Sequence, residues 1–172
     1  MKRPHTATLF VLLCSALVFS AGGAHAMDIS GTISSTLTIT ENSKLVGDVT
    51  CTVVGASCIT FGISGLTLDL NGYNMVGLGD STTGCSGNAT ANEVGILVNM
   101  LENVVVRGPG VVTQFRNTGI LLVGANGGTV TGVTTSTNCA SGILLGGNSS
   151  NNLIENNVSV RNGNLASPCG GI

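Results

Sequence analysis

Carboxylates are the side chains in this sequence that are best suited to chemistry. The eight acids are Asp28, Glu41, Asp48, Asp69, Asp80, Glu93, Glu102 and Glu155. A Ca²⁺ site needs about six to eight oxygen ligands, and glycoside hydrolysis needs two carboxylates at a set separation. The acids are scattered and include no Asp-Asp pair. We therefore predict neither a calcium site nor a catalytic carboxylate pair from their spacing.

Histidine is absent after the first 26 residues, because His5 and His25 are the only two in the chain. Without histidine the chain cannot form a Ser-His-Asp or Cys-His set. It also lacks Cys-x-x-Cys pairs, so no familiar zinc site can form. We predict no catalytic residue, no cofactor and no metal ligand in this stretch.

Four residues remain as weak candidates for surface ligand contacts: Asp69, Asp80, Glu93 and Arg107. Asp69 alternates with apolar residues in 66–70 and is therefore expected on the outside, where such a residue usually solubilises the surface or is bonded locally. Arg107 is expected one repeat further along and diagonal to Asp69, which predicts a weak surface ion pair. Asp80 and Glu93 bracket a polar segment, where a solvated surface role is as strong an alternative as ligand binding.

The first 26 residues have the pattern of a secretory signal peptide. Lys2 and Arg3 precede an apolar run over Ala7–Ala21, and Ala24-His25-Ala26 supplies a small-x-small cleavage site. The run is shorter than the roughly 20 residues of a membrane span, although an uncleaved anchor is the alternative. We expect a secreted, periplasmic or cell-surface protein that is not inserted in the membrane after cleavage.

Charge and composition narrow the class of protein. After the signal the chain keeps four basic residues against eight acids, so no basic patch exists for nucleic acid or an anionic membrane. Gly accounts for 26 of 172 residues and apolar residues for 42%. Val, Ile, Leu and Thr are abundant while helix-favouring residues are scarce, which predicts one all-β domain with many tight turns.

A repeat of about 24 residues runs through the chain. One series of Gly-Ile segments begins at Gly95, Gly119, Gly142 and Gly171. A second series of corner residues is Gly72, Gly108, Gly132 and Asn156. Mostly apolar positions lie two residues before each corner (Leu70, Val106, Val130 and Ile154) and four residues after it (Val76, Val112, Ser136 and Val160). Repetition at a fixed period is typical of solenoids.

Stacked coils must therefore position the candidate residues. We predict an all-β, right-handed parallel β-helix of about five coils, each with about three short strands. The expected segments are a signal at 1–26, an N-terminal cap and first strands at 27–58, and coils at 59–172 with an inserted loop at 79–92. Taken alone, Asn71-Gly72 favours a hairpin, but its place in the repeat predicts a corner. A β-sandwich of hairpins is the alternative fold.

Three sequence features carry a resemblance to a known family: "LVGDVTC" at Leu45–Cys51, "LTLDLNGYNMVG" at 66–77, and the "GILL" segments. The chain resembles secreted right-handed parallel β-helix repeat proteins of the pectate lyase-like superfamily over most of Asp28–Ile172. The resemblance is specific for fold and implies little about chemistry.

An exported chain favours disulfides between its cysteines. In the family that this chain resembles, a cysteine often stands where Ser30 stands here, and it would pair with the position of Cys51; Cys51 is thus left to pair with Cys58. Cys139 and Cys169 both precede a Gly-Ile segment and are expected on adjacent coils, which makes a second bridge feasible. Cys85 is left without a partner in this chain.

The expected function is an exported monomeric scaffold or binding module for polysaccharide. The alternative is the N-terminal part of a polysaccharide lyase or glycoside hydrolase whose active residues lie in missing coils, since the sequence stops two residues into a Gly-Ile segment. Ca²⁺ is expected only in that second case. A periplasmic metal-delivery protein is a third class, which the lack of histidine disfavours.

Overall fold

The computed structural model describes residues 26–79, 92–163 and 171. Within these ranges the chain is all-β and has no helix, so no helix in them is long and apolar enough to cross a membrane. Its strands are β1 (Met27–Ile33), β2 (Leu37–Ile39), β3 (Ser43–Cys51), β4 (Ile59–Phe61), β5 (Thr67–Asp69), β6 (Asn74–Val76), β7 (Ile96–Asn99), β8 (Val105–Arg107), β9 (Val111–Thr113), β10 (Ile120–Val123), β11 (Thr129–Thr131), β12 (Thr134–Ser136), β13 (Ile143–Gly146), β14 (Leu153–Glu155) and β15 (Val158–Val160).

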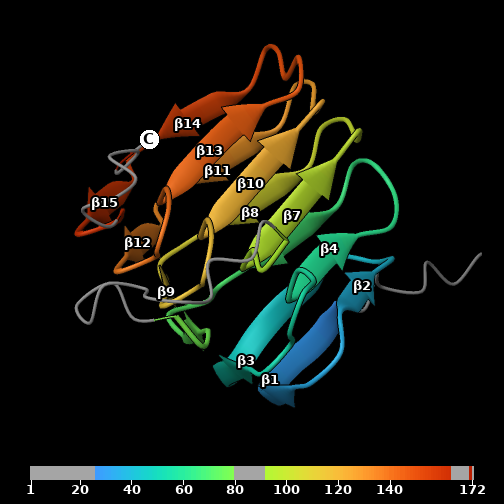
Figure 1. Ribbon diagram of the computed structural model, residues 1–172. Coiled ribbons are helices and arrows are strands. Elements are labelled where there is room, and N and C mark those ends of the chain that lie inside the picture. The colour runs from blue at the N-terminus through green and yellow to red at the C-terminus, as the bar shows by residue number, and fades with distance from the viewer. Residues whose placement is uncertain (1–25, 80–91, 164–170, 172) are drawn as a thin grey trace, which may run out of the picture.

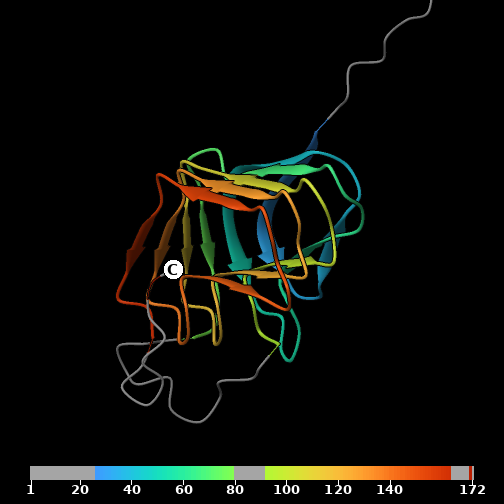
Figure 2. The ribbon, with the colours of Figure 1, turned by 90° about the horizontal axis from the view of Figure 1, so that it is seen from above.

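The strand pairs are parallel, and the strands form two hydrogen-bonded sheets. One sheet has the order β13-β10-β7-β4-β2 (Figure 1). The other has the order β14-β11-β8-β5-β3-β6-β9-β12-β15, and β1 also pairs with β3. The long strand β3 pairs with β5 through its first half and with β6 through its second half, so this sheet bends into two walls. Figure 2 shows the resulting three walls around a common interior.

Each set of three consecutive strands forms a unit that we call a rung. The four rungs are β4–β6, β7–β9, β10–β12 and β13–β15, and each strand of a rung pairs with the same strand of the next. The register matches Ile96 with Ile120 and Ile120 with Ile143. The series of Gly-Ile segments that the sequence predicts is therefore confirmed. Residues 80–91, the body of the predicted insertion, lie outside the described residues.

Inward side chains form columns between the walls. The buried residues of these columns include Leu68, Val106 and Val130 on one wall, Val49, Met75 and Val112 on the second, and Ile59, Ile96, Ile120 and Ile143 on the third. Their spacing is that of parallel strands, about 4.8 Å from rung to rung. Burial of these apolar side chains is the main stabilising term of the fold.

Four predicted column members are wrong by one or two positions: Leu70, Val76, Ser136 and Val160. Val106 pairs with Leu68, where the sequence repeat aligned it with Leu70. Val112 is the inward partner of Met75, whereas Val76 pairs with Thr113. The reason lies in the corner, which has four residues at 70–73, three at 108–110 and two at 132–133. Counting outward from a corner glycine therefore shifts the register when the corner length changes.

The Asn71-Gly72 segment forms a tight corner. Both residues have positive φ, 48° and 87°, and the Tyr73 N–H donates to the Leu70 carbonyl at 2.8 Å. That is the local geometry of a hairpin turn. The strands on its two sides, however, pair with neighbouring rungs and not with each other. The predicted corner is confirmed.

Asparagines attach the corners of the last rung to the rung before it. The side-chain oxygens of Asn152, Asn157 and Asn162 each accept a backbone N–H 24 residues earlier, at 2.8–3.0 Å. Their side-chain nitrogens each donate to a carbonyl 27 residues earlier. One amide thus satisfies a backbone donor and a backbone acceptor that the corner leaves without ladder partners.

Candidate functional site

A column of charged side chains crosses the outer face of the wall that contains β5 and β8. The register places Asp28 beside Lys44, Lys44 beside Asp69, and Asp69 beside Arg107. The same outward column continues through Thr131 to Glu155. Its first four members alternate in sign, and we call them the charged column. Two of the four residues predicted as ligand candidates, Asp69 and Arg107, are therefore neighbours.

Asp69 and Arg107 form a close ion pair. Arg107 Nη2 lies 2.7 Å and Nε 2.8 Å from Asp69 Oδ2. The other oxygen, Oδ1, accepts the Asn71 N–H at 2.8 Å and so caps the corner. The predicted ion pair is confirmed, but the two residues are directly opposite each other instead of diagonal. Asp69 is locally bonded, as its outward position suggested.

The charged column borders a shallow groove of about 310 Å³. Lys44, Asp69 and Arg107 line it, together with the polar residues Asn42, Ser43 and Thr67. Lys44 lies 3.5 Å from Asp28, and the side chains of Lys44 and Arg107 stay 46% and 55% exposed. Because one strand separates them, the two cations are about two strand spacings apart, roughly 9–10 Å. This groove can present two cations and several hydrogen-bonding groups to an elongated ligand.

Glu93 does not lie at the surface, where the sequence placed it. It is only 4% exposed, and its Oε1 accepts the Gly55 N–H at 2.7 Å. Arg116 Nη1 lies 3.3 Å from Oε2 and 3.4 Å from Oε1, so the two residues form a largely buried ion pair. Burial without a partner would be costly for a carboxylate, which explains why both oxygens are bonded.

Arg116 is the partner that sequence reasoning missed. Glu93 precedes Gly95 by two residues, and Arg116 precedes Gly119 by three. Since Gly95 and Gly119 begin equivalent segments of neighbouring rungs, the repeat itself contained the signal that places Glu93 beside Arg116.

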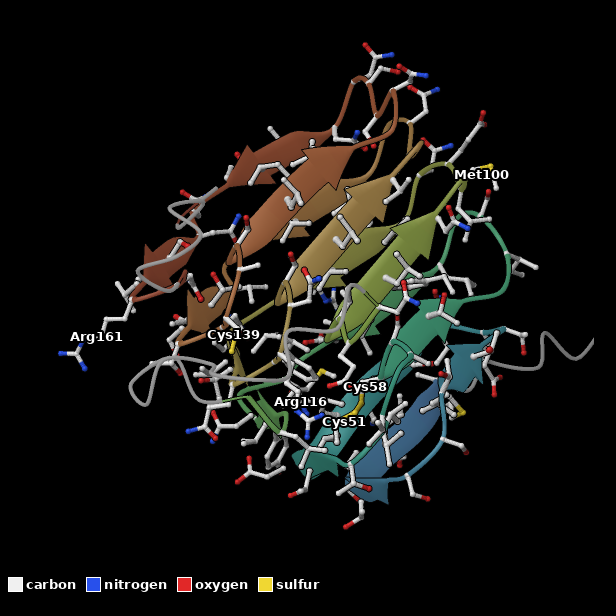
Figure 3. All side chains as sticks on the ribbon, viewed as in Figure 1. Cys51, Cys58, Met100, Arg116, Cys139 and Arg161 are labelled. Carbon is white, nitrogen blue, oxygen red and sulfur yellow. A yellow bond between two sulfur atoms is a disulfide. The ribbon has the colours of Figure 1, made fainter. Side chains whose placement is uncertain are left out.

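The predicted disulfide between Cys51 and Cys58 is confirmed (Figure 3). It closes a loop over 52–57, and Glu93 holds the tip of that loop through Gly55. The Cys58 N–H also donates to the Val94 carbonyl at 2.9 Å. The loop is therefore fixed at both its base and its tip against the rung that contains β7.

A second groove, of about 460 Å³, lies on the outer face of the sheet that contains β4, β7 and β10. Leu97, Leu121 and Val123 form its floor, and residues 55–57 of the disulfide loop form one side. Leu97 and Leu121 belong to an outward column that continues to Leu144. Alternation within each "GILL" segment implies that every second residue faces outward, and this is the sequence signal that predicts an apolar outer column.

Several predicted residues fall outside the described part of the chain. These are Asp80, Cys85 and Cys169. Cys139 is disulfide-bonded, and its partner also lies outside the described ranges, so the predicted Cys139–Cys169 bridge stays a prediction. Among the residues at 26–79, 92–163 and 171, no group of three or more His, Cys, Asp or Glu side chains is arranged to hold a metal ion.

Comparisons with protein-family models, with curated proteins and with solved structures find no match to this chain. The evidence for the parallel, all-β architecture is therefore the strand pairing alone. Membership of the pectate lyase-like superfamily stays a prediction.

Proposed function

We propose that the chain is an exported right-handed parallel β-helix that acts as a binding scaffold for polysaccharide. Three parallel strands per rung and rung-to-rung pairing support the solenoid architecture. Parallel strands joined by crossover connections are right-handed in about 98% of cases, which supports the hand. The signal-like first 26 residues support export.

The charged column is the observation that carries the binding function. Lys44 and Arg107 project from β3 and β8, on either side of β5 on one outer face, and keep about half of their side-chain surface in solvent. An acidic polysaccharide is an extended chain of repeating carboxylates, and it would cross the rungs with its carboxylates on these two cations. Arg107 binds Asp69 through Nε and Nη2, so a carboxylate of the ligand would accept from the remaining N–H groups of its guanidinium.

The test is binding of the purified protein to a panel of acidic polysaccharides, with and without Ca²⁺, by isothermal titration. We expect Arg107→Gln to weaken binding at least about tenfold, since a charge-assisted contact is lost. Arg161→Gln is the matched control, because Arg161 follows β15 at the far end of the molecule (Figure 3) and the charge change is the same.

Two results would count against this proposal. Equal losses in Arg107→Gln and Arg161→Gln would mean that only the net charge matters. Release of unsaturated or reducing sugar ends from any member of the panel would replace the scaffold with the alternative of a lyase or hydrolase.

A further inference from the structure

The groove beside the disulfide loop differs from the charged column in its chemistry. None of the described residues that line it carries a charge. Leu97, Leu121 and Val123 form an apolar floor on an outer face, where a solenoid exposed only to water would more commonly have polar side chains. Its volume falls within the range of about 300–1,000 Å³ that is usual for small-molecule sites.

The hydroxyl groups around the floor show which ligand chemistry fits. Thr36 Oγ1 donates to the Ser57 carbonyl at 2.7 Å, and Thr60 Oγ1 donates to the Leu97 carbonyl at 3.3 Å. Each hydroxyl has thereby used its only proton, and its lone pairs are left as acceptors. A ligand that bonds them must bring its own O–H or N–H donors.

These properties disfavour two ligand classes. An acyl chain would cover the floor but would desolvate the hydroxyls and the amides of Asn92 and Asn99 without bonding them. A carboxylate-rich ligand would meet acceptors at Thr36 and Thr60, with only the amide N–H groups of Asn92 and Asn99 as side-chain donors and no cation in the groove to compensate. A neutral sugar has an apolar ring face and several hydroxyl donors, so it satisfies both the floor and the rim.

We propose that this groove is a second binding site, which takes a neutral glycan segment. The sugar ring lies on Leu97, Leu121 and Val123, and its hydroxyls donate to Thr36 and Thr60 and bond the amides of Asn92 and Asn99. The site differs from the charged column in face, residues and ligand charge, so either one can fail without the other.

Two separate interactions, a disulfide and a hydrogen bond to Glu93, hold the loop that forms one side of the groove. Residues 55–57 are closed off by the Cys51–Cys58 disulfide and anchored by Glu93, which accepts the Gly55 N–H and is paired with Arg116. A loop fixed in this way loses little conformational freedom when a ligand binds. Its rigidity therefore favours the bound state of the neutral glycan.

The experiment is isothermal titration of the purified protein with neutral hexasaccharides (maltohexaose, cellohexaose and mannohexaose), with trigalacturonate and with dodecanoate. We expect at least one neutral hexasaccharide to bind, and neither of the two charged probes to displace it from this groove. Leu121→Lys should weaken that binding at least about tenfold, because a charge on the floor displaces the ring face.

The chain offers a close control for this variant. Leu144→Lys makes the same change one rung further along the same outward column, at a residue that is already 41% exposed and does not line the groove. We expect it to leave binding within about twofold. Asn99→Ala is a second groove variant, at an exposed residue, and should weaken binding without affecting the unfolding midpoint.

Three outcomes would overturn the proposal. The first is that no neutral hexasaccharide binds. The second is that dodecanoate or trigalacturonate competes for the same site with higher affinity. The third is that Leu121→Lys and Leu144→Lys lose binding equally while both remain folded by circular dichroism.

Discussion

Two carboxylate–guanidinium pairs in this chain have the same chemistry and very different surroundings. In the Asp69–Arg107 pair the side chains are 22% and 55% exposed, so solvent screens their attraction. In the Glu93–Arg116 pair they are 4% and 20% exposed, and Glu93 also anchors the disulfide loop. Burial makes the loss of one partner expensive, because the other loses its counter-charge in a site that water does not fully reach.

Neutralising the carboxylate of each pair tests whether the buried pair contributes more to the free energy of unfolding than the exposed pair. We expect Asp69→Asn to lower the free energy of unfolding by about 1 kcal/mol or less, since the amide oxygen still caps the corner through Asn71. We expect Glu93→Gln to cost about 1–3 kcal/mol, since Arg116 loses its counter-charge although Gly55 keeps an acceptor. Urea unfolding followed by circular dichroism measures both. Equal costs would contradict the difference in burial.

At the scale of the element, the "GILL" segments combine two functions in adjacent residues. Leu122 faces inward and is 1% exposed, whereas its neighbour Leu121 faces outward on the groove floor. Strand alternation alone makes this distinction, since successive side chains of a strand point to opposite faces. The "GILL" segment at 119–122 therefore contributes one leucine to the outer face and its neighbouring residues to the core of the fold.

Truncating each leucine tests this alternation. We expect Leu122→Ala to destabilise the protein by about 2–5 kcal/mol through lost burial and a cavity. We expect Leu121→Ala to cost about 1 kcal/mol or less, because its side chain is only partly covered. The midpoint of urea unfolding reports both changes. If Leu121→Ala were the more damaging substitution, the register of β10 would be wrong.

The disulfide loop is the second element with an effect on both stability and the groove. We expect the double variant Cys51→Ala, Cys58→Ala to lose about 2–3 kcal/mol of unfolding free energy, as chain entropy predicts for so short a loop. Thermal unfolding measures the loss.

The same double variant should also bind neutral glycan more weakly than the wild type, because the side of the groove is no longer held at its base. Unchanged affinity in a folded double variant would show that the loop does not contribute to the groove.

At the scale of the whole molecule, the three walls share one interior and differ in their outer faces. The wall of β5 and β8 presents the charged column, and the sheet of β4, β7 and β10 presents an apolar floor. The rung-to-rung pairing allows this separation, because each outward column belongs to one wall along its length. We therefore propose that the two faces bind ligands of different charge.

The repeat in the sequence was enough to predict the parallel strands, the Gly-Ile register and the corner at Asn71-Gly72. It was not enough to predict the register of Leu68 with Val106, because corner length changes along the chain and no residue type specifies it. The outward position and ion pair of Asp69 followed from alternation. The burial of Glu93 did not, since it depends on a guanidinium 23 residues away and on the fold of the disulfide loop.

The most direct test of the account is a pair of ¹⁵N NMR titrations of the protein, one with an acidic oligosaccharide and one with a neutral hexasaccharide. We predict that the acidic ligand shifts the amide signals of Lys44, Asp69 and Arg107, and that the neutral ligand shifts those of Leu97, Asn99 and Leu121. Binding of both ligands at one face would contradict the claim of two separate sites, and no shift at either face with any glycan would contradict the claim that this chain is a glycan-binding scaffold.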